Sequence, residues 1–214
     1  MVDAKHNKDE LPDYEDYVLQ DDDAAQNGNA TAAAKPTAYT GVHTTSFKDM
    51  GLKSELLHSI TDCGFEHPSE VQQRCIPEAL TNNDVLCQAV SGMGKTAVFV
   101  LSILHTMPED PKPCSAMILC HTRELAYQIK NEILRFTKYM KHIRTEVIYG
   151  GEPMENNIKL FKGLNAPHIV VGTPGRILAL TKAGHIPVAN MKTFVLDECD
   201  KLLDQISKSF KRRV

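Results

Sequence analysis

Apolar residues in the first ordered part of the chain recur at helical spacing. Between residues 52 and 63 they fall three to four positions apart, which predicts a helix that stops at Gly64. A second short helix is expected to open at Ser69 and to kink near Pro77, because proline has no backbone N–H to donate inside a helix. Ordered structure is therefore expected to begin near Phe47.

From residue 84 onward, short runs of Val, Ile and Leu alternate with longer amphipathic stretches. The runs predicted to form buried strands are residues 84–89, 115–120, 144–150, 168–172 and 193–197. The helices predicted to follow them are residues 96–107, 123–140, 154–163 and a segment that starts at Pro174, with a short amphipathic stretch after the last strand. Such alternation is typical of an α/β fold in which helices cover both faces of a parallel sheet. Ligands bind such folds at the carboxyl ends of the strands.

The composition excludes several classes of protein. Hydrophobic residues make up 42% of the 214 positions and charged residues 24%, which is too apolar for a disordered chain. No run approaches the roughly 18 apolar residues that a membrane span needs, so no contact with a membrane is expected. The N-terminus is acidic and lacks the apolar core of a secretory signal.

Charge is unevenly distributed along the chain. Residues 1–23 hold nine acidic residues and two lysines, a net charge of −7, whereas the whole chain carries −3 and the remainder therefore +4. Residues 1–40 are predicted to be a disordered acidic leader. The leader is either simply solvated or docks on partners and screens a basic groove. A net charge of +4 on residues 24–214 permits nucleic-acid binding but does not by itself indicate it.

The six cysteines show neither a disulfide framework nor a metal site. No two of them form a C-x-x-C pair, and no Cys or His spacing suits zinc. The sequence therefore predicts a reducing compartment, which is the cytosol or the nucleus.

A glycine-rich turn between a predicted strand and a predicted helix carries the strongest chemical signal. Residues 89–96 read A-V-S-G-M-G-K-T, which has the form [A/G]-x4-G-K-T, with Ala89 in the position that is usually Gly. Such a loop wraps phosphates with its backbone amides, while Lys95 meets the outer phosphates and Thr96 ligates Mg²⁺. The residues expected to bind the nucleotide here are Ser91, Gly92, Gly94, Lys95 and Thr96.

An acidic cluster, residues 197–200 with the sequence D-E-C-D, follows the last predicted strand. A carboxylate at the tip of a buried strand can hold Mg²⁺, which suits Asp197, and a second one can orient or deprotonate water, which suits Glu198. Taken alone, the cluster is equally compatible with a helix N-cap and an exposed acidic turn.

Gln72 has two competing interpretations. An amide side chain offers one donor and one acceptor, which matches the N6/N7 edge of adenine. Residues 69–72 also form a capping box, S-x-x-Q, which needs no ligand. Spacing alone does not separate the two.

Two predicted helices begin with a hydroxyl residue and an arginine directly after a strand. Residues 121–126 and 173–176 each fit helix capping, and each also fits phosphate binding at a helix N-terminus. Together with the glycine pair after a third strand, they favour a track for a nucleic-acid backbone. The residues expected to line this track are Arg123, Gly150, Gly151, Thr173, Gly175 and Arg176.

These motifs together resemble those of the DEAD-box RNA helicases, and the D-E-C-D form resembles the subgroup that serves spliceosome assembly and mRNA export. The resemblance runs from about Tyr39 to Gln205, with a fainter similarity in the leader. It implies a RecA-like phosphate-loop domain, ATP and Mg²⁺ as cofactors, and RNA and splicing or export factors as partners. It also implies a nuclear protein. Cys199 stands where most members of the family have Ala.

The resemblance assigns roles to individual residues. Lys95, Asp197 and Glu198 would be catalytic, and Thr96 and Asp197 would ligate the metal. Gln72 would read adenine together with Phe47, which stands seventeen residues before Gly64 in the sequence. The track residues would contact the RNA backbone.

The family has two RecA-like lobes, and residues 41–214 correspond to the N-terminal, ATP-binding lobe only. The family's Ser-Ala-Thr motif does not occur here, and the arginine fingers belong to the second lobe. Two functions therefore compete: an ATP-dependent RNA helicase represented by one lobe, and a non-catalytic module that binds nucleotide, RNA or partners. A small kinase or GTPase is a third interpretation, but the chain lacks the N-K-x-D motif that reads guanine.

Overall fold

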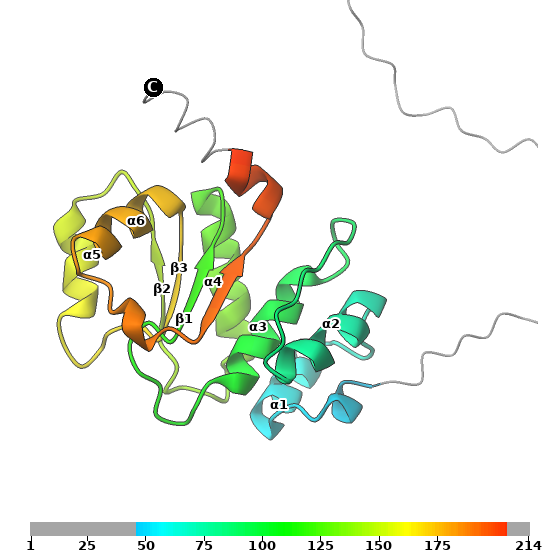
Figure 1. Cartoon of the computed structure of the whole chain (residues 1–214). Coiled ribbons are helices and arrows are strands. Elements are labelled where there is room, and N and C mark those ends of the chain that lie inside the picture. The colour runs from blue at the N-terminus through cyan, green and yellow to red at the C-terminus, as the bar shows by residue number, and fades with distance from the viewer. Residues whose placement is uncertain (1–45, 205–214) are drawn as a thin grey trace, which may run out of the picture. The chain divides into compact units, whose positions relative to one another are not determined.

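Four parallel strands form the sheet of the described part of the chain, residues 46–204 of a computed structural model. They are β1 (Ala116–Leu119), β2 (Thr145–Ile148), β3 (Ile169–Gly172) and β4 (Thr193–Leu196), in the spatial order β2-β3-β1-β4 (Figure 1). In register, Ala116 of β1 pairs with Ile169 of β3 and with Thr193 of β4. The predicted leader, residues 1–40, lies outside the described residues.

Six α-helices accompany this sheet within residues 46–198. They are α1 (Ser54–Asp62), α2 (Glu70–Leu80), α3 (Lys95–Thr106), α4 (Arg123–Phe136), α5 (Met154–Phe161) and α6 (Pro174–Lys182). Two short 3₁₀ segments, Phe47–Met50 and Val188–Asn190, and a helical stretch at 199–204 complete the described chain. None of the helices within residues 46–204 is long and apolar enough to cross a membrane.

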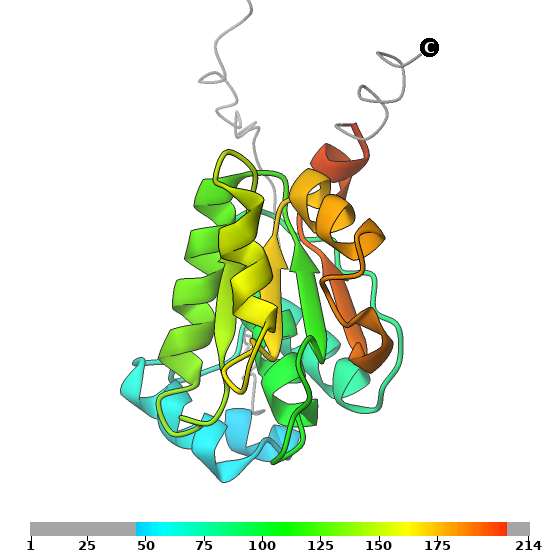
Figure 2. The same ribbon diagram turned by 90° about the vertical axis from the view of Figure 1, so that its left-hand side faces the viewer.

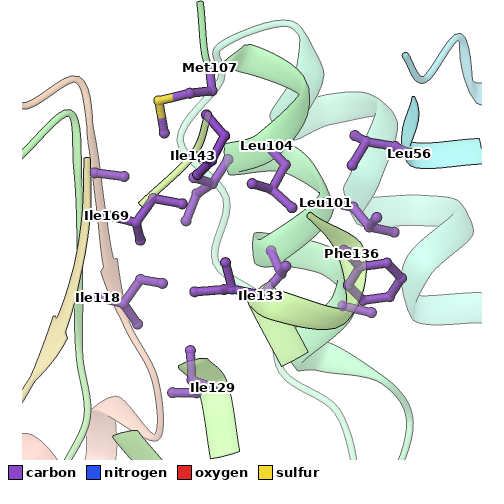
Figure 3. Close-up of a cluster of buried hydrophobic side chains, with 14 of the residues drawn as sticks. Leu56, Leu101, Leu104, Met107, Ile118, Ile129, Ile133, Phe136, Ile143 and Ile169 are labelled. Carbon is purple, nitrogen blue, oxygen red and sulfur yellow. The ribbon is translucent and has the colours of Figure 1, made fainter. Parts of the chain in front are cut away.

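Both faces of the sheet are covered, as the sequence predicted (Figure 2). Successive side chains of a strand point to opposite faces, so β1 divides its residues between two apolar clusters. Ile118 packs with residues of α1, α3 and α4, whereas Met117 packs with residues of α5 and α6. The first cluster is the larger, and Figure 3 shows its centre between the sheet and α3.

Helix α3 is apolar on almost every side because it lies inside the first cluster. Its buried apolar residues are Ala97, Val98, Val100, Leu101, Ile103 and Leu104. Helix α4 instead buries one face only, with Ile129, Ile133 and Phe136 at helical spacing. Helix α3 begins at Lys95, directly after the glycine-rich loop.

The predicted strand at residues 84–89 is wrong. This segment has no regular secondary structure, and the side chain of Leu86 is 91% exposed. A run of apolar residues becomes a strand only when a neighbouring strand supplies its hydrogen bonds, and no described strand pairs with this one. The sheet ends at β4, whose Phe194 and Leu196 remain 50% and 45% exposed.

The other predicted elements are present, with bounds that differ from the predicted ones by a few residues. Helix α2 begins after Ser69 as expected, and it continues through Pro77 to Leu80. Helix α4 ends at Phe136 rather than at residue 140. The chain after α1 turns at Gly64, which adopts a positive φ of 77° that glycine tolerates best.

Candidate functional site

The glycine-rich loop leads into the N-terminus of α3. Gly92 and Gly94 adopt φ values of 85° and 78°, in the left-handed region, and Gly94 is the N-cap of the helix. Lys95 and Thr96 are its first two residues, so their backbone N–H groups have no partner within the helix. Free amides at the positive end of a helix dipole favour an anion at this point.

Lys95 lies between the loop and the acidic cluster. Its ammonium donates to the carbonyl oxygens of Ala89 at 2.5 Å and Val90 at 3.1 Å. The pKa of the Asp197 carboxyl is raised, mainly by burial, and the charge of Lys95 partly offsets this rise. The two groups are therefore near enough for their charges to interact, although they are about a hundred residues apart in the sequence. The structure therefore brings together the two motifs that the sequence placed at the ends of separate predicted strands.

Gln72 caps α2 and also contacts the glycine-rich loop. Its side-chain oxygen accepts from the Ser69 N–H at 3.0 Å, and its side-chain nitrogen donates to the Gly94 carbonyl at 3.2 Å. The Ser69 hydroxyl in turn donates to the Met93 carbonyl at 2.8 Å. The capping interpretation is thus confirmed, and the side chain is only 3% exposed. Adenine recognition by Gln72 stays a prediction.

Phe47 belongs to the core. It is 4% exposed and packs edge-on against Phe65, with ring centroids 6.4 Å apart. Only a small part of the ring is therefore open to a ligand, and its contact with adenine stays a prediction.

The acidic cluster is half-buried rather than fully exposed at its first two residues. Burial raises the pKa of the Asp197 carboxyl, and the charge of Glu198 raises it further, whereas the Glu198 N–H and the Lys95 and His121 charges lower it. The Asp197 N–H donates to the Leu119 carbonyl at 2.9 Å, which fixes Asp197 at the carboxyl end of the sheet.

Glu198 is held by two basic side chains that the sequence analysis did not identify. Its Oε2 atom lies 3.1 Å from His121 Nδ1 and 2.8 Å from Lys201 Nζ. Its backbone φ is 50°, which a residue with a side chain adopts only under constraint. His121 lies two residues after the last residue of β1, and this position beyond the carboxyl end of a strand was the one available signal for it.

The predicted track residues gather on one pocket of about 620 Å³. It is lined by His121, Thr122, Arg123, Glu124, Gly150, Thr173, Gly175, Arg176 and Ala179. Gly151 is adjacent, because a methyl group on its Cα would lie 2.7 Å from the Arg123 guanidinium. The six predicted residues are thus brought together, although they come from three separate loops and helix starts.

The two helix starts differ in how they are capped. The Thr122 hydroxyl accepts from the Leu125 N–H at 3.1 Å, so capping is confirmed there. Thr173 makes no side-chain capping bond, although Pro174 occupies the first turn of α6 as expected. The Thr173 hydroxyl therefore lines the pocket without serving as a cap.

A sequence model described as "DEAD/DEAH box helicase" matches residues 69–214, more than half of the chain. The chain belongs to this family. It shares 52% identity with the ATP-dependent RNA helicase sub2 of Aspergillus fumigatus and 53% with SUB2 of Ajellomyces capsulatus, and each match covers 94% of this chain. The chain spans about half the length of these curated relatives, 49% and 50%.

Solved structures of DEAD-box proteins share the fold. A DEAD-box protein from Methanococcus jannaschii superimposes with a TM-score of 0.70 at 38% identity, covering 75% of this chain and 43% of that one. A Saccharomyces cerevisiae Dbp5 variant bound to RNA and ADP BeF3 gives 0.66 at 38% identity, covering 75% and 40%. The predicted RecA-like α/β fold is therefore confirmed.

The DEAD-box chain carries donors that suit Mg²⁺ shared with a nucleotide. Carboxylate and hydroxyl oxygens, which Asp197 and Thr96 provide, are the ligands that Mg²⁺ prefers, and it usually takes the rest from phosphates and water. Within residues 46–204, no group of three His, Cys, Asp or Glu side chains is arranged to hold a metal by itself. The donor set thus fits a metal that arrives with phosphates.

Proposed function

We propose that this chain is the ATP-binding lobe of an ATP-dependent RNA helicase. The observation that carries the proposal is the glycine-rich loop that ends at Gly94, the N-cap of α3, with Lys95 and Thr96 as the first two residues of the helix. A glycine-rich phosphate loop that faces a carboxylate across a helix N-terminus is the arrangement that nucleoside triphosphate hydrolysis requires.

The residues of this site have distinct tasks in the proposal. Lys95 and the free amides of α3 bind the phosphates, while Thr96 and Asp197 hold Mg²⁺, which supplies charge neutralisation when bound. Glu198 orients the attacking water and takes its proton. The adenine end is assigned to Gln72 and to the accessible part of Phe47.

RNA is proposed to bind the 620 Å³ pocket through its backbone. Arg123 and Arg176 provide positive charge there, and the glycines let the chain approach phosphates closely. The two curated relatives are named ATP-dependent RNA helicases, which supports this assignment. The pocket and the nucleotide site are joined by His121, which lines the pocket and contacts Glu198.

A role in mRNA splicing and nuclear export, with splicing and export factors as partners and a nuclear location, extends the proposal. It is supported by the D-E-C-D sequence at residues 197–200, which resembles the subgroup with those roles.

A second candidate is a non-catalytic module that binds nucleotide, RNA or partners. Two contacts favour it: the Lys95 ammonium is engaged by loop carbonyls, and the Glu198 carboxylate by His121 and Lys201. Both groups would have to leave these partners before they could act on a nucleotide.

RNA-stimulated phosphate release separates the two candidates. Purified residues 1–214 should bind ATP weakly, hydrolyse it barely and unwind nothing. A version extended by the second lobe of a relative should show both activities, because arginine fingers are worth roughly 10³–10⁵ in rate. An extended version that binds RNA and ATP without hydrolysis would support the non-catalytic module. Unwinding by residues 1–214 alone would show that one lobe suffices.

A further inference from the structure

Both arginines of the proposed RNA pocket are held by one segment of the chain. Arg123 comes from the first turn of α4 and Arg176 from the first turn of α6. The partners of both lie between residues 149 and 157, where β2 passes into α5. Three of these partners, Tyr149, Glu152 and Asn157, lie outside the motifs that the sequence analysis identified.

Arg123 rests on an aromatic ring. Its guanidinium carbon lies 5.2 Å from the centroid of the Tyr149 ring. On another side it meets Gly151, where a Cβ atom would lie 2.7 and 3.1 Å from its two terminal nitrogens. The ring and the glycine backbone together restrict the positions that the guanidinium can take.

The Tyr149 ring is itself fixed by hydrogen bonds. Its hydroxyl donates to Glu152 Oε1 at 2.6 Å and lies 2.9 Å from the Tyr127 hydroxyl. The bond to Glu152 is also the main cause that raises the pKa of the Tyr149 hydroxyl, so the hydroxyl stays protonated and remains a donor. The ring is thus held at its hydroxyl end as well as by its backbone, which directly follows β2.

Arg176 is held by hydrogen bonds instead. One terminal nitrogen donates to Asn157 Oδ1 at 2.6 Å, and the other donates to the Glu152 carbonyl at 2.7 Å. Asn157 is 4% exposed, so its amide needs such a partner inside the protein. A guanidinium has five N–H donors, which leaves others available for a ligand.

We propose that Tyr149 and Asn157 are positioning residues that set Arg123 and Arg176 in place for an RNA backbone before RNA arrives. A free arginine side chain loses much rotamer freedom when it binds, and a side chain that is already held loses less. Because both anchors sit on one short segment, they also fix the two guanidinium groups relative to each other. The inference rests on the proposed RNA-binding function of the pocket.

The test measures binding of residues 1–214 to a fluorescent single-stranded oligouridylate by anisotropy, at several salt concentrations. Tyr149→Leu should weaken binding roughly 2–5-fold, the value of an exposed cation–π contact. Tyr149→Phe keeps the ring and should retain most of the affinity. Tyr139→Leu is the control, because Tyr139 is an exposed tyrosine that has its own lysine contact and lies beyond the far end of α4.

The decisive comparison is a pair of double-mutant cycles. If Tyr149 acts through Arg123, Tyr149→Leu should have no further effect once Arg123→Ala is present. Asn157→Ala should likewise lose its effect in Arg176→Ala, and Asn157→Asp, which keeps the acceptor, should restore binding. Arg123→Ala and Arg176→Ala should each reduce the slope of log affinity against log salt by about 0.7.

Three outcomes would overturn the inference, and they are distinguishable. If the arginine variants weaken RNA binding but Tyr149→Leu and Asn157→Ala do not, the proposed function stands and the positioning role is wrong. Additive effects in both cycles would mean that the anchors act on the fold rather than on the arginines. Arginine variants without any effect would remove the RNA pocket itself. Far-UV circular dichroism checks folding, and if Asn157→Ala does not fold, the Tyr149 cycle decides.

Discussion

Replacement of Gly94 by alanine tests the contact between the glycine-rich loop and the Gln72 side chain of α2. Gly94 has a φ of 78°, and a Cβ atom there would lie 2.3 Å from the side-chain nitrogen of Gln72. Gly92 offers a matched control, because its φ of 85° is similar and a Cβ atom there meets nothing within 4 Å. The two substitutions therefore share the backbone strain and differ in the clash.

The expected loss in the free energy of unfolding follows from these contacts. An L-residue in the left-handed region costs about 1–2 kcal/mol, which applies to both variants. In Gly94→Ala the Gln72 side chain must also move, which breaks its bonds to the Gly94 carbonyl and the Ser69 N–H. Loss of these partners for a buried amide costs a further ~1–3 kcal/mol. For a chain of this size that corresponds to an additional loss of about 2–12 °C in Tm.

Urea unfolding followed by far-UV circular dichroism is the suitable assay, because the chain has no Trp. Gly94→Ala should unfold at a lower urea concentration than Gly92→Ala. In a Gln72→Ala background the clash is absent, so Gly94→Ala should then cost only the backbone strain. Equal midpoints for the two glycine variants would refute the contact between Gln72 and the loop.

Three further results are expected. Glu198→Gln in a two-lobed version should retain ATP binding while RNA-stimulated phosphate release slows by roughly 10²–10⁴-fold, and a loss of binding would make Glu198 structural. Burial and the charge of Arg144 lower the pKa of His168 to about 4, whereas the unfolded chain takes up this proton near pH 6.5. Stability should therefore fall as the pH drops from about 6.5 towards 4, and His168→Gln should flatten that decline in urea unfolding; an unchanged decline would contradict the assignment. An exposed apolar edge strand favours pairing with another chain, so Phe194→Lys on β4 should lower the light-scattering signal of concentrated protein without lowering Tm, and an unchanged signal would contradict this role of the edge.

The sequence predicted the elements whose pattern is local. The strands β1 to β4 are short segments rich in Val, Ile and Leu, and α4 has one apolar face. Both patterns can therefore be recognised in the sequence without a structure. The phosphate loop and the acidic cluster were likewise found from adjacent residues. Their mutual approach was expected from the rule that parallel strands present their carboxyl ends at one edge, although residues 84–89, which lead into the phosphate loop, form no strand.

The parts that were missed depend on residues far apart in the chain. Residues 84–89 have the composition of a strand, but pairing with a neighbour decides whether a strand forms, and composition does not report the neighbour. The contacts of Glu198 with His121 and of Arg176 with Asn157 join separate elements. A single tyrosine or asparagine carries no local sign of such a partner.

The most direct test of the account is the binding of a fluorescent ATP analogue to residues 1–214 and to Lys95→Ala, each with and without Mg²⁺. The unaltered chain should bind the analogue weakly and only when Mg²⁺ is present. Loss of a charge-assisted hydrogen bond should weaken it by roughly 10–150-fold in Lys95→Ala, with thermal stability nearly unchanged. Lys159→Ala, on the exposed side of α5, should bind as the unaltered chain does. Equal affinity of Lys95→Ala and the unaltered chain would contradict the assignment of the phosphate loop, and with it the proposed ATP site.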